Sequence, residues 1–408
     1  MSSLAELSTA YGAASPHELF ARMREERPIS QVRLPNGVPV WMVTRHADAR
    51  AALGDPRLST RIGAPLVAEA LPPEIRAGMG THMLRVDGAD HTRLRRLVSS
   101  VFTARRIEGL RPVIEEMTGE LLDTMAESEH PDVIRDLAFP LPLRVIYELL
   151  GVPHADRKRF SAWSNTYLTG IGTQTLPVEV ITEFVTYLRE LVAQKRAEPD
   201  DRLLSAMLVA RDHEDRLSED ELTSMCFLLI VAGYETVMNF IGIGALILLS
   251  DRELADRLRA DPEAMAPAVE EFLRFESPTP GASFRIATEP LTLAGQAIGK
   301  GELVSISLLS ANRDEAVFAD PHRLRADRGP TAHLAFGHGI HYCLGAALSR
   351  LEARVALGRL LDRFPEIALL DPAAPPKWWP GFVVRGLSEL PVTLGRPARP
   401  GPSRPETA

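Results

Sequence analysis

The residues best suited to carry chemistry lie in one short, glycine-rich stretch near the C-terminal end of the chain. Residues 336–346 read FGHGIHYCLGA, and Cys343 is one of only two cysteines among the 408 residues. Gly337 and Gly339 permit a tight loop with positive φ angles, which would bring backbone N–H groups close to the cysteine sulfur. A helical pattern follows over 344–361, so the sulfur is expected near a positive helix end, which lowers the pKa of a thiol. A cysteine outside such a context is most often a buried apolar residue.

A cysteine thiolate is one of the ligands that proteins offer to haem iron. It pushes electron density onto the metal and favours cleavage of the O–O bond, and N–H donors to the sulfur tune the potential of the iron. The stretch resembles the cysteine-loop signature of the cytochrome P-450 superfamily, and the likeness to its soluble bacterial members extends over nearly the whole chain. The resemblance implies that Cys343 is the axial ligand of haem b (iron protoporphyrin IX) and that Phe336 and Gly345 contact this cofactor.

The rest of the sequence is mostly helical in its periodicity, with minor β structure. A hairpin is expected over 32–43, turning at Asn36 and Gly37, and short strands are expected over 277–309. Helices are expected over 89–102, 106–127, 141–150, 154–168, 177–198 and 202–211. The resemblance implies a mainly α fold with small β-sheets, in which residues 1–408 form a single domain and a long central helix crosses the haem. The tail over 396–408 is rich in Pro and Arg and is expected to be disordered.

One helical segment is apolar on all sides. Over residues 225–249 the only residue of a type charged at neutral pH is Glu235, and the segment is long enough to span a bilayer. A carboxylate near the middle costs roughly 2.5–3.5 kcal/mol on membrane insertion scales, which favours the central helix of a large soluble protein instead. The helix is expected to begin at Ser218, where Ser218 and Glu221 form a capping box.

The middle of this helix combines small residues with a polar pair. Ala232 and Gly233 would let a planar cofactor lie against the backbone, and Thr236 can bond back to the carbonyl four residues earlier. On the residues alone, this is equally a packing notch with an incidental polar pair. The resemblance implies that Glu235 and Thr236 are the catalytic acid and alcohol, which relay the protons needed for dioxygen activation.

Four cationic or donor groups are candidates for binding the two haem propionates. His91 and Arg95 stand four residues apart on one helical face, a pattern that is usually a solvated basic stripe. The resemblance implies that both reach the propionates, together with Arg285 and with His341, two residues before the cysteine. Charge-assisted hydrogen bonds to carboxylates suit all four side chains.

Two further groups of charged residues have structural or docking interpretations. Glu271 and Arg274 share a helix face, where such a pair is usually solvated; the resemblance implies a structural role in holding the core. Several arginines near these elements could form a basic face for an acidic iron–sulfur ferredoxin, although scattered surface arginines are an equal alternative. These arginines are Arg93, Arg96, Arg105, Arg106, Arg350 and Arg354.

The resemblance also indicates where a substrate would bind. The regions expected to line the distal pocket are 58–83, 163–184, 279–284 and 381–383, which contain many Gly, Pro, Thr and small apolar residues. We therefore expect a roomy, mainly apolar pocket with a mobile lid. It would suit a medium-sized lipophilic molecule such as a polyketide, macrolide, terpenoid or sterol.

Composition excludes several classes of protein. Lys and Arg total 46 against 54 Asp and Glu, a net charge of −8, so no general attraction to nucleic acid or anionic membrane is expected. Two cysteines are too few for a disulfide framework or a cysteine-based zinc site and suit a reducing cytoplasm. Residues 1–18 contain no apolar run of the kind found in secretory signals. We expect a cytoplasmic enzyme.

The expected activity is that of a monooxygenase, which inserts one oxygen atom from O2 into the substrate, most simply by C–H hydroxylation. The chain has no GxGxxG fingerprint and no cysteine cluster, so electrons from NAD(P)H would arrive through a separate ferredoxin reductase and ferredoxin. Two alternatives remain. A peroxygenase driven by H2O2 is disfavoured because related peroxygenases carry an arginine and a proline where Glu235 and Thr236 stand. A non-enzymatic haem-thiolate sensor would need an output domain, and none is visible.

Overall fold

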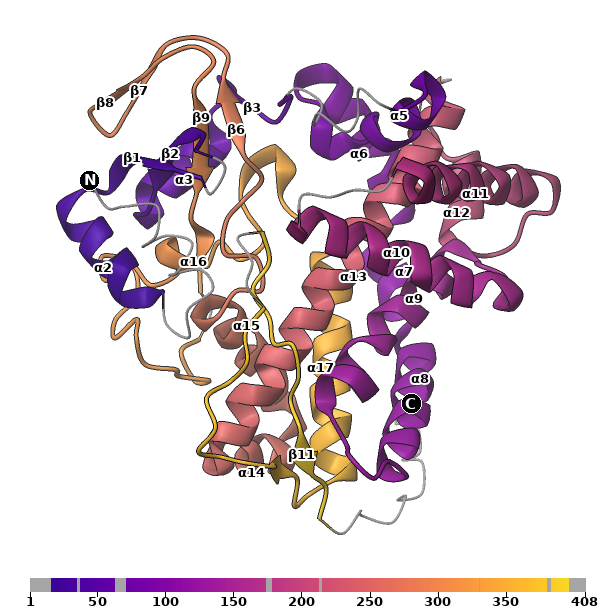
Figure 1. Cartoon of the computed structure of the whole chain (residues 1–408), viewed down its shortest axis with the longest axis vertical. Helices are drawn as coiled ribbons and strands as arrows, with labels where there is room; N and C mark the ends of the chain where they lie inside the picture. The colour runs from indigo at the N-terminus through magenta and orange to yellow at the C-terminus, as the bar shows by residue number, and fades with distance from the viewer. Residues whose placement is uncertain are drawn as a thin grey trace.

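Helices form most of the structure, a computed structural model that describes residues 16–34, 37–62, 71–173, 178–212, 215–329, 331–379 and 383–395 (Figure 1). The helices are α2 (His17–Glu26), α3 (His46–Gly54), α5 (Pro73–Gly80), α6 (Gly88–Val101), α7 (Ala104–Glu108), α8 (Arg111–Ala126), α9 (Pro140–Leu150), α10 (Arg157–Thr173), α11 (Val178–Ala197), α12 (Leu203–Val209), α13 (Glu219–Ser250), α14 (Arg252–Ala260), α15 (Met265–Phe275), α16 (Leu308–Ala311) and α17 (Ala346–Arg363). The mainly α fold expected from the sequence is confirmed.

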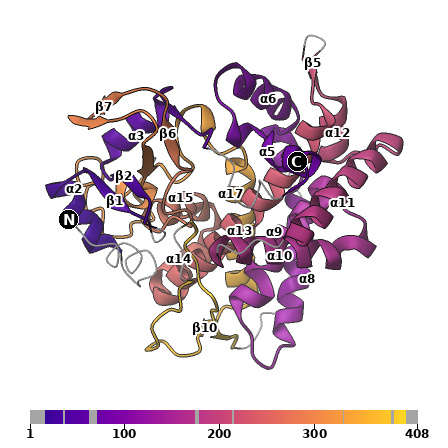
Figure 2. The same cartoon turned by 45° about the horizontal axis from the view of Figure 1, so that its top comes forward.

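The strands of the main sheet lie together with α2 and α3 on one side of the long helices, whereas β5 and β11 lie elsewhere, as Figures 1 and 2 show. The main sheet has the order β1-β2-β9-β6-β3, in which β2 and β9 are parallel and the other neighbours are antiparallel. Two-stranded sheets are formed by β7 with β8, β4 with β5, and β10 with β11. The strands are β1 (Ile29–Arg33), β2 (Pro39–Val43), β3 (Leu58–Ser59), β4 (Arg211–Asp212), β5 (Asp215–Arg216), β6 (Arg285–Ala287), β7 (Leu291–Leu293), β8 (Gln296–Ile298), β9 (Leu303–Ile306), β10 (Ala368–Leu369) and β11 (Val392–Thr393).

The predicted hairpin is the pair β1 and β2, with Val32 opposite Val40. Gly37 has the positive φ angle, +84°, that a tight turn requires. Asn36, the other residue of the predicted turn, lies outside the described residues. The strands expected over 277–309 are β6 to β9.

α13 is the central helix of the fold (Figure 2). Ser218 caps it with the predicted capping box to Glu221, and it packs against α5, α9, α11 and α17. Within the described residues it is the one helix long and apolar enough to cross a membrane, but 67% of its apolar window is buried inside the protein. A Cβ atom on Gly244 would lie 2.7 Å from Leu357 of α17, so glycine permits this close approach. Packing against neighbouring helices therefore accounts for its apolar surface.

Two predicted helix boundaries are wrong. The single helix expected over 106–127 is two helices, α7 and α8, separated by Gly109 and Leu110. Pro112 lies in the first turn of α8, where its missing N–H is harmless, whereas inside a continuous helix its ring would clash with the preceding turn. The last helix begins at Ala346 with Gly345 as its N-cap, two residues later than expected. The region over 58–83, expected to line the pocket, contains β3 and α5; its residues 63–70 lie outside the described residues.

Candidate active site

The glycine-rich stretch forms a tight loop that presents Cys343 just before α17. Gly337 and Gly339 have φ angles of +74° and +76°, as expected, and the Cys343 N–H donates to the Phe336 carbonyl at 2.9 Å. A Cβ atom on Gly339 would lie 3.0 Å from the carbonyl oxygen of Leu53. Any larger residue there would push the loop away from α3.

Cys343 is exposed, and a Cβ atom on Gly345 would lie 4.0 Å from its sulfur. Burial raises the pKa of the thiol, although the Gly345 and Ala346 N–H groups and the charges of Arg95 and Arg350 lower it. The N–H groups at the start of α17 thus lower this pKa as predicted, but desolvation outweighs them and the net shift is upward. A metal cation bound to the sulfur would supply the missing stabilisation of the thiolate.

The four predicted propionate ligands converge beside this loop. The rings of His91 and His341 lie 4.5 Å apart, and Arg95 Nη1 donates to the Tyr342 carbonyl at 2.7 Å. Burial, then the neighbouring charges of His341, Arg95 and Arg285, lower the pKa of His91 to about 4. His91 is therefore uncharged at neutral pH, whereas Arg95 and Arg285 add positive charge that would favour an anion bound here.

Two of these donors are buried without a partner. His91 is 2% exposed and Arg285 is 3% exposed, yet His91 Nε2 and Arg285 Nε have no hydrogen-bond partner among the residues that the structure describes. Buried polar atoms are rarely left unpaired in native proteins. The carboxylates of a bound cofactor would satisfy them, so the residues present fit haem.

Asp87 belongs to this cluster and was not predicted. Its carboxylate accepts hydrogen bonds from His341 Nε2 at 3.0 Å and from the hydroxyls of Ser59 and Thr60. These bonds lower the pKa of Asp87 against the effect of burial. Asp87 orients the His341 ring and compensates part of the positive charge. No feature of the sequence connects it with His341, 254 residues later.

The middle of α13 carries the predicted distal residues. Thr236 Oγ1 donates to the Ala232 carbonyl at 2.8 Å, as expected. Ala232 is exposed although it lies in the middle of an apolar helix, and a Cβ atom on Gly233 would have only Ile146 nearby, at 3.4 Å. Burial raises the pKa of Glu235 to about 7. This acid can both release and accept protons near neutral pH.

Glu271 and Arg274 are buried, contrary to the pattern usual for such a pair. They are 1% and 0% exposed, and Arg274 binds both carboxylate oxygens at 2.7 Å. Arg274 also donates to the carbonyls of Asn312 and Pro321. Arg328, which was not predicted, binds the same carboxylate at 3.1 Å. The cluster ties α15 to the chain that leads to the cysteine loop.

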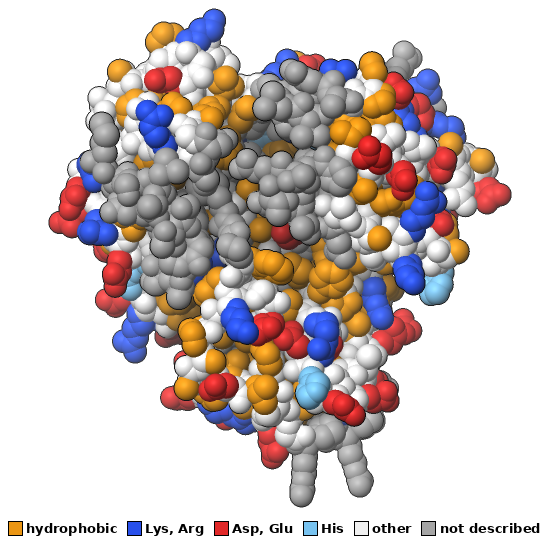
Figure 3. Space-filling view, in the orientation of Figure 1, with side chains coloured by type: hydrophobic (Ala, Val, Ile, Leu, Met, Phe, Trp, Pro, Cys, Tyr) orange, Lys and Arg blue, Asp and Glu red, His pale blue; other side chains and the backbone are white. Residues whose placement is uncertain are grey.

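The predicted basic face is partly neutralised. Arg93 pairs with Glu221 of α13, and Arg350 binds both oxygens of Glu270. On the face seen in Figure 3, acidic and basic side chains are interspersed without a wide area of one sign. These ion pairs reduce the charge available for docking a partner.

The expected pocket-lining regions are only partly described. Residues 63–70 and 381–382, and the side chains of 167–177, lie outside the described residues. Trp163 and Phe184 are buried and stacked, with ring centres 5.8 Å apart, so these two side chains form core rather than pocket wall.

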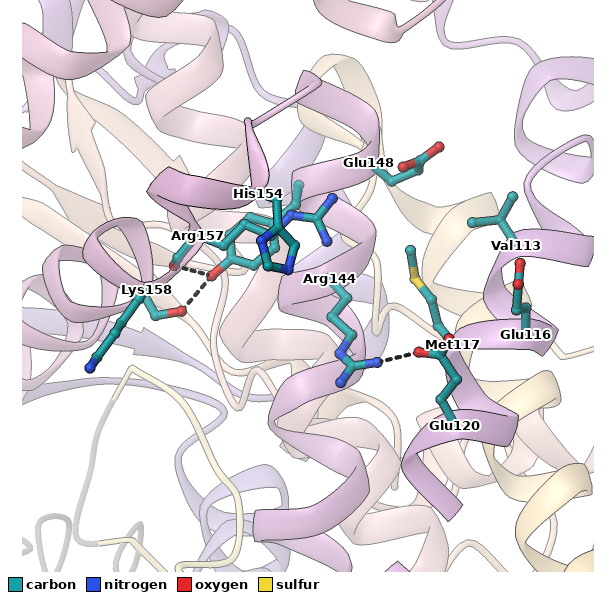
Figure 4. A pocket seen from close by; sticks show the side chains of 11 residues that line it. Val113, Glu116, Met117, Glu120, Arg144, Glu148, His154, Arg157 and Lys158 are labelled. Atoms are coloured by element: carbon teal, nitrogen blue, oxygen red, sulfur yellow. Dashed lines mark hydrogen bonds and ion pairs between the residues drawn. The ribbon is translucent and has the colours of Figure 1, made fainter. Parts of the chain in front are cut away.

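A cavity of about 640 Å³ lies between α8, α9 and the start of α10 (Figure 4). Its lining includes an ion pair in which Arg144 Nη1 lies 2.9 Å from Glu120 Oε2, and Figure 4 shows this pair bridging two helices. None of the predicted site residues lines it. It is therefore distinct from the site around Cys343.

A thiol loop, a central helix with an acid and an alcohol, and converging cations together define a haem-thiolate protein. The sequence model of the family described as cytochrome P-450 matches residues 173–384. Cytochrome P-450 107B1 of Saccharopolyspora erythraea is 45% identical over 390 residues, which cover 94% of this chain and 96% of the relative. The chain belongs to the cytochrome P-450 family, and it is accordingly a haem-dependent monooxygenase.

Two further relatives are similar over nearly their whole length. The vitamin D(3) 25-hydroxylase of Pseudonocardia autotrophica is 43% identical over 386 residues, covering 93% of this chain and 94% of the relative. The structure of PksS, a cytochrome P-450 of the bacillaene polyketide synthase of Bacillus subtilis, superimposes with a TM-score of 0.87 at 39% identity and covers 95% of this chain and 99% of that chain. The expected fold is therefore confirmed over almost the entire chain.

Proposed function

We propose that this monooxygenase hydroxylates a C–H bond of a medium-sized lipophilic substrate, of the polyketide, macrolide, terpenoid or sterol-like kind. The observation that carries the proposed site is the group of buried, unpaired donors of His91 and Arg285 beside the loop of Cys343. These donors match the two carboxylates of haem, and the loop presents the sulfur next to them. Haem held in this way supplies the activation of O2.

The residues of the chain take separate roles in this proposal. Cys343 binds the iron through its sulfur, and Phe336 and Gly345 contact the cofactor on the same side. His91, Arg95, Arg285 and His341 hold the propionates, and Ala232 and Gly233 leave room for the macrocycle on the other side. Ala232 is exposed, which is consistent with room for the macrocycle beside this part of the helix.

Glu235 and Thr236 would handle protons on the substrate side. A carboxyl with a pKa near 7 matches the pH at which a proton relay works best. The Thr236 hydroxyl, which bonds to the Ala232 carbonyl, has a lone pair left to position a water molecule. This pair also favours the monooxygenase over a peroxygenase.

The substrate class draws support from the relatives. One relative is named for vitamin D(3) and another belongs to a polyketide synthase, and both kinds of molecule are lipophilic and of medium size. The electron donors in this proposal are a ferredoxin and its reductase, and the location is the cytoplasm. We also propose that residues 1–408 form one domain.

A carbon monoxide difference spectrum tests the proposed ligand. The reduced wild-type protein should show a strongly red-shifted Soret band, and Cys343→Ala should lose it because no thiolate remains. Cys226→Ala is the matched control: Cys226 is buried in α13, and burial raises its pKa to about 12, so it stays a thiol. A red-shifted band that persists in Cys343→Ala would overturn the assignment. Turnover with a ferredoxin system, absent with H2O2 alone, would then separate the monooxygenase from the peroxygenase and the sensor.

A further inference from the structure

Glu270 of α15 connects the two segments of chain on either side of the cysteine loop. Its carboxylate accepts from Arg350 Nε at 2.6 Å and Arg350 Nη2 at 2.8 Å, and from His333 Nε2 at 3.1 Å. Burial alone would raise the pKa of Glu270, but the hydrogen bonds from His333 and Arg350 lower it to about 2. The carboxylate is therefore ionised at neutral pH. It holds His333 before the loop and Arg350 after it.

The contacts of His333 define its tautomer. Its Nδ1 accepts the Ala335 N–H at 3.2 Å, so the ring proton resides on Nε2 and is donated to Glu270. The His333 side chain is only 4% exposed. The segment that leads into the loop is consequently anchored to α15 by a partly buried hydrogen bond.

Arg350 contacts two residues of the cysteine loop, Phe336 and Tyr342. Its guanidinium carbon lies 4.4 Å from the centre of the Phe336 ring, and its Nη1 lies 3.5 Å from Tyr342 Oη. Phe336 in turn accepts the N–H of Cys343. The positive charge of Arg350 therefore lies beside the loop that presents the Cys343 sulfur. A bidentate carboxylate is the partner that best fixes a guanidinium in one plane.

We infer that Glu270 is a positioning residue for the cysteine loop: it holds Arg350 flat against Phe336 and balances the positive charge that the sulfur of Cys343 experiences. The inference rests on the proposed role of Cys343 as haem ligand. It assigns to Arg350 a function within the protein, in place of the partner-docking role expected from the sequence. Glu270 acts through Arg350 and His333, without touching the sulfur itself.

The reduction potential of the haem protein tests the balance of charge. Glu270→Gln leaves the charge of Arg350 uncompensated, so the potential should become more positive. Arg350→Gln removes that charge, so the potential should become more negative, and the double variant should return towards the wild-type value. Glu253→Gln is the matched control, because Glu253 is an exposed glutamate on α14 and its loss should leave the potential unchanged.

The stability of the thiolate ligand tests positioning separately from charge. In the reduced, carbon monoxide-bound protein, the red-shifted Soret band should be lost several-fold faster on mild warming in Glu270→Gln, in Arg350→Gln and in the double variant. Glu270→Asp keeps the charge but shortens the reach. It should therefore keep the wild-type potential and still lose the band faster.

The outcomes separate this inference from the proposed function. If the potential shifted in the same direction in Glu270→Gln and in Arg350→Gln, the inference that Glu270 balances the charge of Arg350 would be wrong. A general loosening of the fold would shift the potential in the same direction in both variants. If every variant lost the red-shifted band at the wild-type rate, Glu270 would not be a positioning residue for the cysteine loop. A wild-type protein that lacks the red-shifted band would instead overturn the assignment of Cys343, before any variant is compared. If Glu270→Gln fails to bind haem, Glu270→Asp and Arg350→Gln still decide the question.

Discussion

Cys343 and Glu235 are proposed to take part in the chemistry, and the surrounding protein shifts the pKa values of both side chains. Burial raises the pKa of both, although Cys343 also has N–H groups and two arginines that act in the opposite direction. For Cys343, the net effect means that the polypeptide alone favours the thiol, and a bound metal is needed to hold the thiolate. For Glu235, the raised pKa allows the carboxyl group to release and accept protons near neutral pH.

Replacement of Glu235 by glutamine should slow substrate oxidation about 100-fold, at the lower end of general acid–base contributions. The amide cannot exchange a proton, so the part of the wild-type pH–rate profile that titrates near pH 7 should disappear. The measurement is the rate of product formation against pH in a reconstituted system. Glu253→Gln serves as the control on an exposed site. A wild-type profile retained in Glu235→Gln would exclude this carboxyl as the relay.

The raised pKa of Glu235 also makes the stability of the folded protein depend on pH. Its pKa in the folded protein is higher than the ordinary value of 4.5, so its contribution to stability is full below that value and is lost as the pH rises through about 7. Glu235→Gln should therefore be relatively more stable than the wild type on the alkaline side.

At the scale of elements, α15 and the residue after it carry three carboxylates with separate roles. Glu270 binds the residues on either side of the cysteine loop, Glu271 and Arg274 bind the segment over 312–328, and Glu276 binds Arg385. Each carboxylate is matched by an arginine. A short helix thereby holds a long irregular connection that has few regular backbone pairs of its own.

Arg274→Met should lower the free energy of unfolding by about 3 kcal/mol, at the lower end of the cost of breaking a buried ion pair, because Glu271 loses its bidentate partner but keeps its ion pair with Arg328. It also leaves the carbonyls of Asn312 and Pro321 without their donor. Urea unfolding followed by haem absorbance measures the change. Arg61→Met, which removes an exposed ion pair with Asp90, should change it by less than about 1 kcal/mol. Equal effects of the two variants would contradict the buried role.

At the scale of the molecule, one carboxylate joins segments from both ends of the chain. Glu276 is 8% exposed and accepts from His17 of α2 at 3.0 Å and from Arg385 at 2.5 Å, with Arg313 at 3.5 Å. Arg385 stacks over Trp378, 3.8 Å from the ring centre. Glu276 therefore binds side chains from three distant parts of the chain, which are α2, the segment after α16 and the C-terminal segment.

Acid should destabilise the protein through Glu276. Burial raises its pKa, but hydrogen bonding from His17 and the charges of Arg385 and Arg313 prevail and lower it to about 2 from 4.5. A carboxyl with a depressed pKa contributes stability above its unfolded pKa and loses it as the pH falls towards the folded value. Thermal unfolding of the holoprotein between about pH 5 and about pH 3 should fall more steeply in the wild type than in Glu276→Gln. Parallel slopes would show that Glu276 is not responsible.

Local patterns in the sequence were sufficient for the helical class, the capping box at Ser218, the glycine turn before Cys343 and the central placement of the apolar helix. Each of these depends on neighbours a few residues apart, where spacing and conformational preference act directly. The break between α7 and α8 also has a local cause, Pro112, but the apolar periodicity continues across it and predicted a single helix.

Only the tertiary structure decided the contacts between distant segments. Asp87 and His341, Glu270 and Arg350, and Glu276 and Arg385 come together across 254, 80 and 109 residues. Such pairs depend on how helices pack, and ionisation depends on the burial that packing produces. For that reason the sequence indicated which residues could bind a haem, whereas the fold decided that the Cys343 thiol is desolvated, that Glu271 is buried, and that Arg350 is held by Glu270.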